Sequence, residues 1–128
     1  MQVPDGLLYT QDHEWLRVEG DEAVVGITEY AATELGDIVF VEMPAIGARF
    51  DAAQSFGVIE SVKTASDLYA PAAGEIVAVN DALHDKPELV NTDPYGDGWM
   101  IRVKLATGAG GIDGLMDAAA YRALIESA

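Results

Sequence analysis

The sequence predicts a mainly β domain, built as a compact sandwich or a flattened barrel of short strands. Short apolar runs that alternate with polar residues recur along the chain, and turn residues separate them. Thirteen glycines and five prolines are scattered without a period, as expected for many short elements. The chain has 128 residues, half of them hydrophobic, so we expect one core and a single domain over residues 1–128.

The first part of the chain is expected to form a hairpin and then a short helix. Residues 14–27 (EWLRVEGDEAVVGI) alternate in polarity on both sides of a turn at Gly20, which predicts a β-hairpin. A short helix is expected near 28–35, because Thr28 can cap its start and Gly36 can end it.

The rest of the chain is expected to contain further strands, a loop and a second helix. Residues 80–98 (NDALHDKPELVNTDPYGDG) are polar and interrupted by prolines and glycines, so we expect a loop. Residues 114–127 (GLMDAAAYRALIES) have an apolar face that includes Leu115 and Met116, and Asp117 could cap a turn, so a C-terminal helical segment is predicted. Further strands are expected within 37–44, 45–54, 55–62, 66–80 and 99–105.

The charge of the chain excludes some classes of partner. Seven basic residues against 22 acidic ones give a formal net charge of −15, which opposes binding to nucleic acid and to anionic membrane surfaces. No apolar run approaches the roughly 20 residues that a membrane span requires. The first residues lack a basic start and a long apolar region, so no secretory signal is expected. We expect a cytoplasmic protein, or a mitochondrial one whose transit peptide has been removed.

No self-contained active site is visible in the sequence. The chain has no cysteine, which excludes a disulfide, a zinc–thiolate site and a cysteine nucleophile. His13 and His84 lie far apart in the sequence, and motifs for a P-loop, a calcium loop or a zinc protease are incomplete or absent. The glycine-rich residues 108–114 (GAGGIDG) lack the third glycine of a dinucleotide fingerprint. We therefore expect a binding or carrier module with no metal site, and not an enzyme.

A lysine stands between two strand-like runs in residues 56–71 (FGVIESVKTASDLYAP). The apolar alternation fades before Lys63, and the small polar residues around it, such as Ser61 and Thr64, favour a tight reversal. Lys63 is therefore expected at the tip of a β-hairpin. From these residues alone, a solvated surface lysine without a function is the simpler interpretation.

The residues around Lys63 also resemble the lipoyl-attachment region of glycine cleavage system H proteins. The resemblance rests on ESVKTASDLYAP together with GEIVAVN, and it runs in the same order over nearly the whole chain, from about Leu8 to Ile125. The other segments that carry it are HEWLR, VGITEYAATELGDIVFVEMPAIGARF, NDALHDKPELVNTDPYGDGWMIRVK and LMDAAAYRALI.

This resemblance implies a fold, a cofactor and a set of site residues. The fold would be the lipoyl/biotinyl-type sandwich, or barrel-sandwich hybrid, of small antiparallel sheets. Lipoic acid would be joined by an amide to Lys63, and its dithiolane would supply the sulfurs that the chain lacks. Glu14 and Asp67 would shelter the loaded arm.

The resemblance also implies partners. The chain would shuttle an aminomethyl group from a pyridoxal-phosphate glycine decarboxylase to a tetrahydrofolate-dependent aminomethyltransferase. It would carry reducing equivalents to a dihydrolipoyl dehydrogenase, and a lipoate-attaching enzyme would modify it. We expect a monomer.

Two other roles for the same lysine stay open. The chain could be a lipoyl donor in cofactor relay, or a lipoyl domain that serves another acyl-transfer complex. Biotin sites usually flank the lysine with methionines, whereas Val62 and Thr64 flank Lys63. The N-terminal hairpin and the C-terminal helix argue against a domain of a larger complex.

Overall fold

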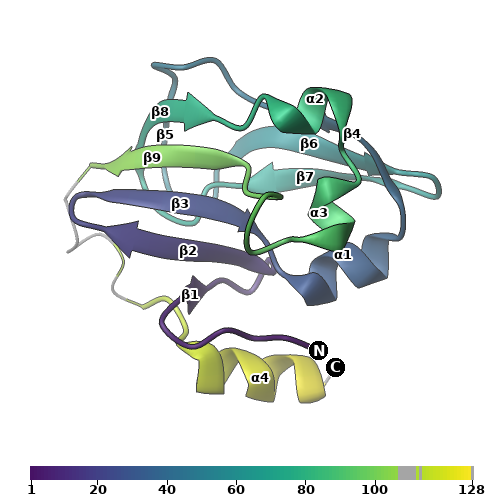
Figure 1. The fold of residues 1–128 in the computed structure, drawn as a ribbon. Helices are drawn as coiled ribbons and strands as arrows, with labels where there is room; N and C mark the ends of the chain where they lie inside the picture. Colours follow the sequence, from purple (N-terminus) through teal and green to yellow (C-terminus); the bar gives the residue numbers. More distant parts are fainter. Residues whose placement is uncertain (107–111, 113, 128) are drawn as a thin grey trace.

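The structure is a computed structural model that describes residues 1–106, 112 and 114–127 (Figure 1). In these residues the chain forms a six-stranded sheet in the order β1-β2-β3-β9-β8-β5 and a three-stranded sheet in the order β4-β6-β7. Every pairing is antiparallel, which confirms the mainly β class. The strands are β1 (Leu8–Tyr9), β2 (Glu14–Glu19), β3 (Glu22–Ile27), β4 (Ile38–Glu42), β5 (Arg49–Phe50), β6 (Ser55–Ser61), β7 (Ala65–Tyr69), β8 (Gly74–Val79) and β9 (Ile101–Leu105).

Two helices begin after the capping residues that the sequence indicates. Helix α1 spans Glu29–Leu35, and the hydroxyl of Thr28 accepts a hydrogen bond from the N–H of Ala31 at 3.2 Å. Gly36 ends the helix with a φ of +85°, a backbone conformation that glycine adopts without a steric penalty. Helix α4 spans Ala118–Glu126. Its cap is Asp117, as the sequence indicates.

The C-terminal helix is shorter than expected. Leu115 and Met116 lie outside α4, because Met116 exchanges two backbone hydrogen bonds with Tyr9 of β1, at 2.8 and 2.9 Å. This bridge extends the edge of the six-stranded sheet. The glycine-rich residues 108–114 lie mostly outside the described part of the chain.

The expectation of a loop over 80–98 is wrong. This segment contains two short helices, α2 (Ala82–Asp85) and α3 (Leu89–Thr92). Each has one fully buried apolar side chain, Leu83 in α2 and Val90 in α3. Helices of four residues are too short to show a periodic apolar face, so local polarity hides the packing that forms them.

The six-stranded sheet, the three-stranded sheet and helices α1, α2 and α3 enclose the main core. A second, smaller cluster lies where the N-terminal residues meet α4. There the rings of Tyr9 and Tyr121 stack with centroids 4.7 Å apart. The guanidinium of Arg122 donates to the carbonyl of Val3 at 2.7 Å, so the N-terminal residues and α4 lie side by side (Figure 1). Within the described residues, no helix is both long enough and apolar enough to cross a bilayer.

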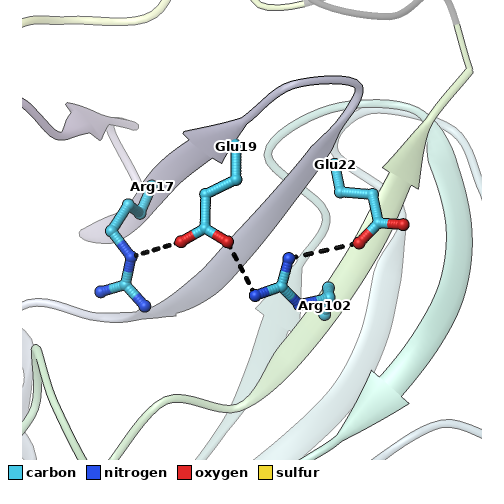
Figure 2. Close-up of polar contacts among 4 residues, drawn as sticks. All are labelled: Arg17, Glu19, Glu22 and Arg102. Carbon is cyan, nitrogen blue, oxygen red and sulfur yellow. Dashed lines mark hydrogen bonds and ion pairs between the residues drawn. The ribbon is translucent and has the colours of Figure 1, made fainter.

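An ion-pair network joins β2, β3 and β9 on the surface of the large sheet (Figure 2). Arg102 lies 2.8 Å from Glu19 and 3.2 Å from Glu22, and Arg17 lies 3.1 Å from Glu19. Hydrogen bonds from Arg102 and Arg17 lower the pKa of Glu19. All four side chains are 33% to 43% exposed, so water screens these pairs and their contribution to stability is small.

Candidate functional site

Lys63 lies in the turn that joins β6 to β7, and its side chain is exposed. The backbone N–H of Ser61 donates to the carbonyl of Thr64 at 2.8 Å. The hydroxyl of Ser61 accepts the N–H groups of Lys63 and Thr64, at 3.3 and 3.2 Å. The small polar residues that predicted a reversal thus close the turn, and Lys63 stands at the tip of the β6–β7 hairpin, as expected.

The tip of this hairpin is attached to the connection between α1 and β4. The N–H of Val62 donates to the carbonyl of Asp37 at 3.0 Å. The stem of the Lys63 side chain lies along Gly36, where an added methyl group would be 3.6 Å from Cε of Lys63. The backbone next to Lys63 is therefore held in place, although the Lys63 side chain is exposed and can meet a partner.

Exposure alone does not distinguish Lys63 from the other lysines. Lys86 is also exposed and follows α2 as its C-terminal cap, and Lys104 projects from β9 between two neighbouring strands. Only Lys63 of the three is on a hairpin tip. Within the described residues, Lys63 forms no ion pair.

A pocket of about 320 Å³ lies between α1, the β6–β7 hairpin and the start of β2. Gly36, which lies near Cε of Lys63, directly follows the helix that forms one wall of this pocket. The lining combines apolar side chains with four carboxylates. The apolar set includes Ile27, Ala31, Leu35, Ile59 and Leu68, and the carboxylates are Asp12, Glu14, Glu34 and Asp67.

Glu14 is the buried carboxylate of this pocket, with 2% of its surface exposed. Its Oε2 accepts the backbone N–H of Tyr69 at 2.7 Å. Its Oε1 is the only buried side-chain nitrogen or oxygen among the described residues that has no hydrogen-bond partner. Burial raises the pKa of Glu14 to about 8, and the hydrogen bond from Tyr69 partly offsets this rise. A donor bound in the pocket would therefore meet an acceptor that lacks a partner.

Asp67 lines the same pocket but differs from Glu14 in its environment. It lies on β7 opposite Val58 of β6, and its side chain is exposed. The two carboxylates expected to act together thus border one cavity, one from the core and one from the solvent side.

His13, to which the sequence assigns no role, forms part of the wall of this pocket. Its backbone φ of +65° is uncommon for a residue with a side chain. Nδ1 of His13 lies 2.8 Å from the hydroxyl of Tyr121, which lies 2.8 Å from the hydroxyl of Thr28, the N-cap of α1. Burial lowers the pKa of His13. Helix α4 thus supports the pocket, a role that sequence reasoning missed because Tyr121 is 108 residues from His13.

A larger depression, of about 560 Å³, is lined by residues of β5, β8 and the end of β9. These strand ends lie on the other side of the molecule from the turn between β6 and β7 (Figure 1). The depression is lined by Arg49, Phe50, Glu75 and Lys104, among others, and Arg49 pairs with Glu75 at 3.2 Å. None of its described lining residues has a buried side-chain nitrogen or oxygen that lacks a hydrogen-bond partner. The smaller pocket beside Lys63 is therefore the better candidate for function.

Comparison with known proteins identifies the family. The family profile described as "Glycine cleavage H-protein" matches residues 7–128. The chain belongs to the glycine cleavage H-protein family.

Relatives of this family agree over almost their full length. A glycine cleavage system H protein of Bacteroides thetaiotaomicron is 55% identical over 98% of this chain and 98% of its own length. One from Halorhodospira halophila is 57% identical over 97% of this chain and 95% of its own. A crystal structure of a glycine cleavage system H protein from Mycobacterium marinum is 40% identical, with a TM-score of 0.89, and the match covers 96% of this chain and 98% of that one.

These comparisons confirm two of the sequence-based expectations. The fold is the lipoyl-type sandwich of antiparallel sheets with few helices, and it is not a closed barrel. An H-protein is a carrier component and not a catalytic enzyme, as the sequence suggested when it showed no self-contained active site.

Proposed function

We propose that this chain is the lipoyl-bearing shuttle of a glycine cleavage system and that Lys63 is its attachment residue. One observation carries the proposal. An exposed lysine on a hydrogen-bonded hairpin tip stands next to a pocket whose buried carboxylate has an oxygen without a partner.

The residues present fit a lipoyl group and an amine carried on it. The pocket volume of about 320 Å³ is at the small end of the roughly 300–1,000 Å³ that small-molecule sites occupy. Its apolar wall, with Ile59 and Leu68, suits an aliphatic arm. Glu14 Oε1 offers an acceptor for an ammonium group, and Asp67 adds a negative charge at the rim.

The chain and the attached group have separate tasks. When bound, lipoic acid supplies a disulfide that can accept electrons and a carbon unit. The hairpin presents Lys63 to each enzyme in turn, because Ser61 closes the turn and Val62 is bonded to Asp37. Tethering to a docked protein also raises the local concentration of the arm, on the order of millimolar for short flexible linkages.

Glu14 and Asp67 would protect the cargo between enzymes. A cationic amine in the pocket would favour the ionised form of Glu14, because an opposite charge lowers the pKa of a carboxyl. The apolar wall would keep water from the aminomethyl group and so slow its hydrolysis, which releases formaldehyde and ammonia and leaves the thiol. His13 and Tyr121 would keep this side of the pocket closed, since both are held in one hydrogen-bonded set with Thr28.

The proposed partners are a glycine decarboxylase, a tetrahydrofolate-dependent aminomethyltransferase and a dihydrolipoyl dehydrogenase, together with a lipoate-attaching enzyme. The assignment of these reactions rests on family membership and on the Lys63 site. A monomeric state, a single domain and a cytoplasmic location stay predictions.

The test is the mass of the modified chain and the reaction it supports. Protein made in a host that attaches lipoate should carry one lipoyl increment on Lys63, located by peptide mapping. Lys63→Arg should fold with an unchanged circular-dichroism spectrum, lack the increment, and abolish glycine-dependent carbon dioxide release in the reconstituted system. Lys86→Arg is the matched control and should behave as the native chain. An increment on Lys86 or Lys104, or full activity of Lys63→Arg, would overturn the proposal.

A further inference from the structure

Asn91, on α3, bonds to the chain on both sides of Asp37. Its side-chain Nδ2 donates to the carbonyl of Gly36 at 2.8 Å, and its Oδ1 accepts the N–H of Ile38 at 2.9 Å. One amide therefore holds residues 36–38, where the chain passes from α1 into β4, at both ends.

This connection is the surface on which the lysine hairpin rests. The carbonyl of Asp37, between the two residues that Asn91 holds, accepts the N–H of Val62 at 3.0 Å. Gly36 also lies near Cε of Lys63. A continuous set of hydrogen bonds thus runs from Asn91, through residues 36–38, to the residue directly before the lysine.

Helix α3 gives Asn91 a fixed base. Val90, its neighbour in the chain, is fully buried in the main core. The N–H of Gly98 donates to the carbonyl of Asp93 at 2.8 Å, and an added methyl group on Gly98 would be 2.6 Å from the carbonyl oxygen of Leu89. The backbone therefore packs closely around this short helix, and Asn91 acts from a part of the molecule that has little freedom to move.

We propose that Asn91 is a positioning residue for the chemistry at Lys63, and that it fixes the position and orientation of the hairpin tip for the lipoate-attaching enzyme. This inference rests on the proposed function, since it assumes that Lys63 is modified. An enzyme that must place one amine at a reacting carbonyl is sensitive to displacements of about 1 Å, which can change rates by about a hundredfold. Loss of the hydrogen bonds from the Asn91 amide would leave the Lys63 amine exposed, but the hairpin backbone that carries it would be held less firmly.

A second asparagine provides the matched control. Asn80 also uses its amide to join separate segments, because Nδ2 donates to the carbonyls of Asp97 and Trp99 at 2.8 and 2.7 Å. Its Oδ1 accepts the N–H of Ala82 at 3.3 Å. No described hydrogen bond links the Asn80 side chain to the hairpin or to residues 36–38, so its loss should affect stability without affecting Lys63.

The experiment compares Asn91→Asp with Asn80→Asp. The carboxylate of Asn91→Asp keeps an acceptor for the N–H of Ile38 but puts its other oxygen against the carbonyl of Gly36. With lipoate, ATP and a purified lipoate–protein ligase, we expect kcat/KM for Asn91→Asp to fall at least about tenfold. For Asn80→Asp, kcat/KM should stay within about twofold of the native value, even where both variants lose similar stability in urea. Equal rates for the two variants, or falls that follow their stability losses, would refute a positioning role.

Hydrogen exchange provides a second measurement, which can first be made on the native chain. In the native chain, the amides of Val62 and Ile38 should both be protected and should exchange by the same local opening. In folded Asn91→Asp, the amide of Val62 should lose protection, the amide of Ile38 should lose less because the carboxylate still accepts its N–H, and the amides of β3 should keep theirs. If, in the native chain, the Val62 amide exchanges freely while the Ile38 amide is protected, the hydrogen bonds of Asn91 do not restrain the hairpin. If the native chain itself is not modified at Lys63, the proposed function fails, and this outcome is distinct from a failure at Asn91.

Discussion

The two ends of β2 place the same residue type in opposite environments. Glu14 starts the strand inside the pocket, and one of its oxygens has no partner. Glu19 ends the strand at the surface, where two arginines bond to it (Figure 2). The pKa of Glu14 is raised and that of Glu19 is lowered. The well-paired carboxylate belongs to a surface that water already solvates, whereas the poorly paired one costs stability and marks the candidate site.

The largest expected effect is that of Glu14→Gln on stability as the pH rises. At pH below about 4.5, Glu14 is protonated in both the folded and the unfolded state and contributes no pH dependence. Between about 4.5 and about 8, only the folded state holds the proton, so this group makes the native chain less stable as the pH increases. Glutamine does not titrate and still accepts the N–H of Tyr69.

Urea titrations of both chains at about pH 5 and about pH 9 measure this effect. The advantage of Glu14→Gln should grow with pH and reach an order of a few kcal/mol. A difference that does not change with pH would mean that Glu14 has a partner in solution, and the contrast between the two ends of β2 would disappear.

A smaller effect is expected at Asp67, which borders the same pocket from the solvent side. Asp67→Asn should leave the urea midpoint unchanged, because the carboxylate is exposed and forms no ion pair within the described residues. Formaldehyde release from the loaded, modified chain should become faster, about fivefold at most, since an exposed charge contributes about 1 kcal/mol or less. A large loss of stability would place Asp67 on the buried side of the comparison with Glu14.

The smallest effect is expected at Glu19. Glu19→Gln should not shift the urea midpoint beyond experimental error, at low salt or in about 1 M salt, because water already screens its contacts with Arg17 and Arg102. The free energy of unfolding of Glu19→Gln should also vary with pH in the same way as that of the native chain above about pH 5. A stability change as large as that of Glu14→Gln would show that the network is more than a surface feature.

The sequence predicts those features whose signal is local. Thr28 and Gly36 mark the ends of α1, and Ser61 and Thr64 mark the turn at Lys63, because each acts on backbone groups within a few residues. The pocket is harder to predict. Glu14 meets the N–H of Tyr69 across 55 residues of sequence, so its burial depends on how the two sheets pack.

The segment 80–98 is where local reasoning fails most clearly. Its polarity suggests a loop, yet Leu83 and Val90 are buried in the core, on the short helices α2 and α3. The contact of Asn91 with Gly36 depends on this packing and has no counterpart in local sequence. The short strand β1 also has no signal in the sequence, because two residues show no alternation.

The N-terminal residues and α4 lie side by side, away from the tip of the β6–β7 hairpin (Figure 1). Two different enzymes fused to this chain, one at each end, would therefore be anchored at nearly the same place. Both attachment points lie away from the turn that carries Lys63, so a single lysine arm could visit both enzymes without leaving the assembly. The fold thus provides a ready basis for a one-chain relay of consecutive reactions.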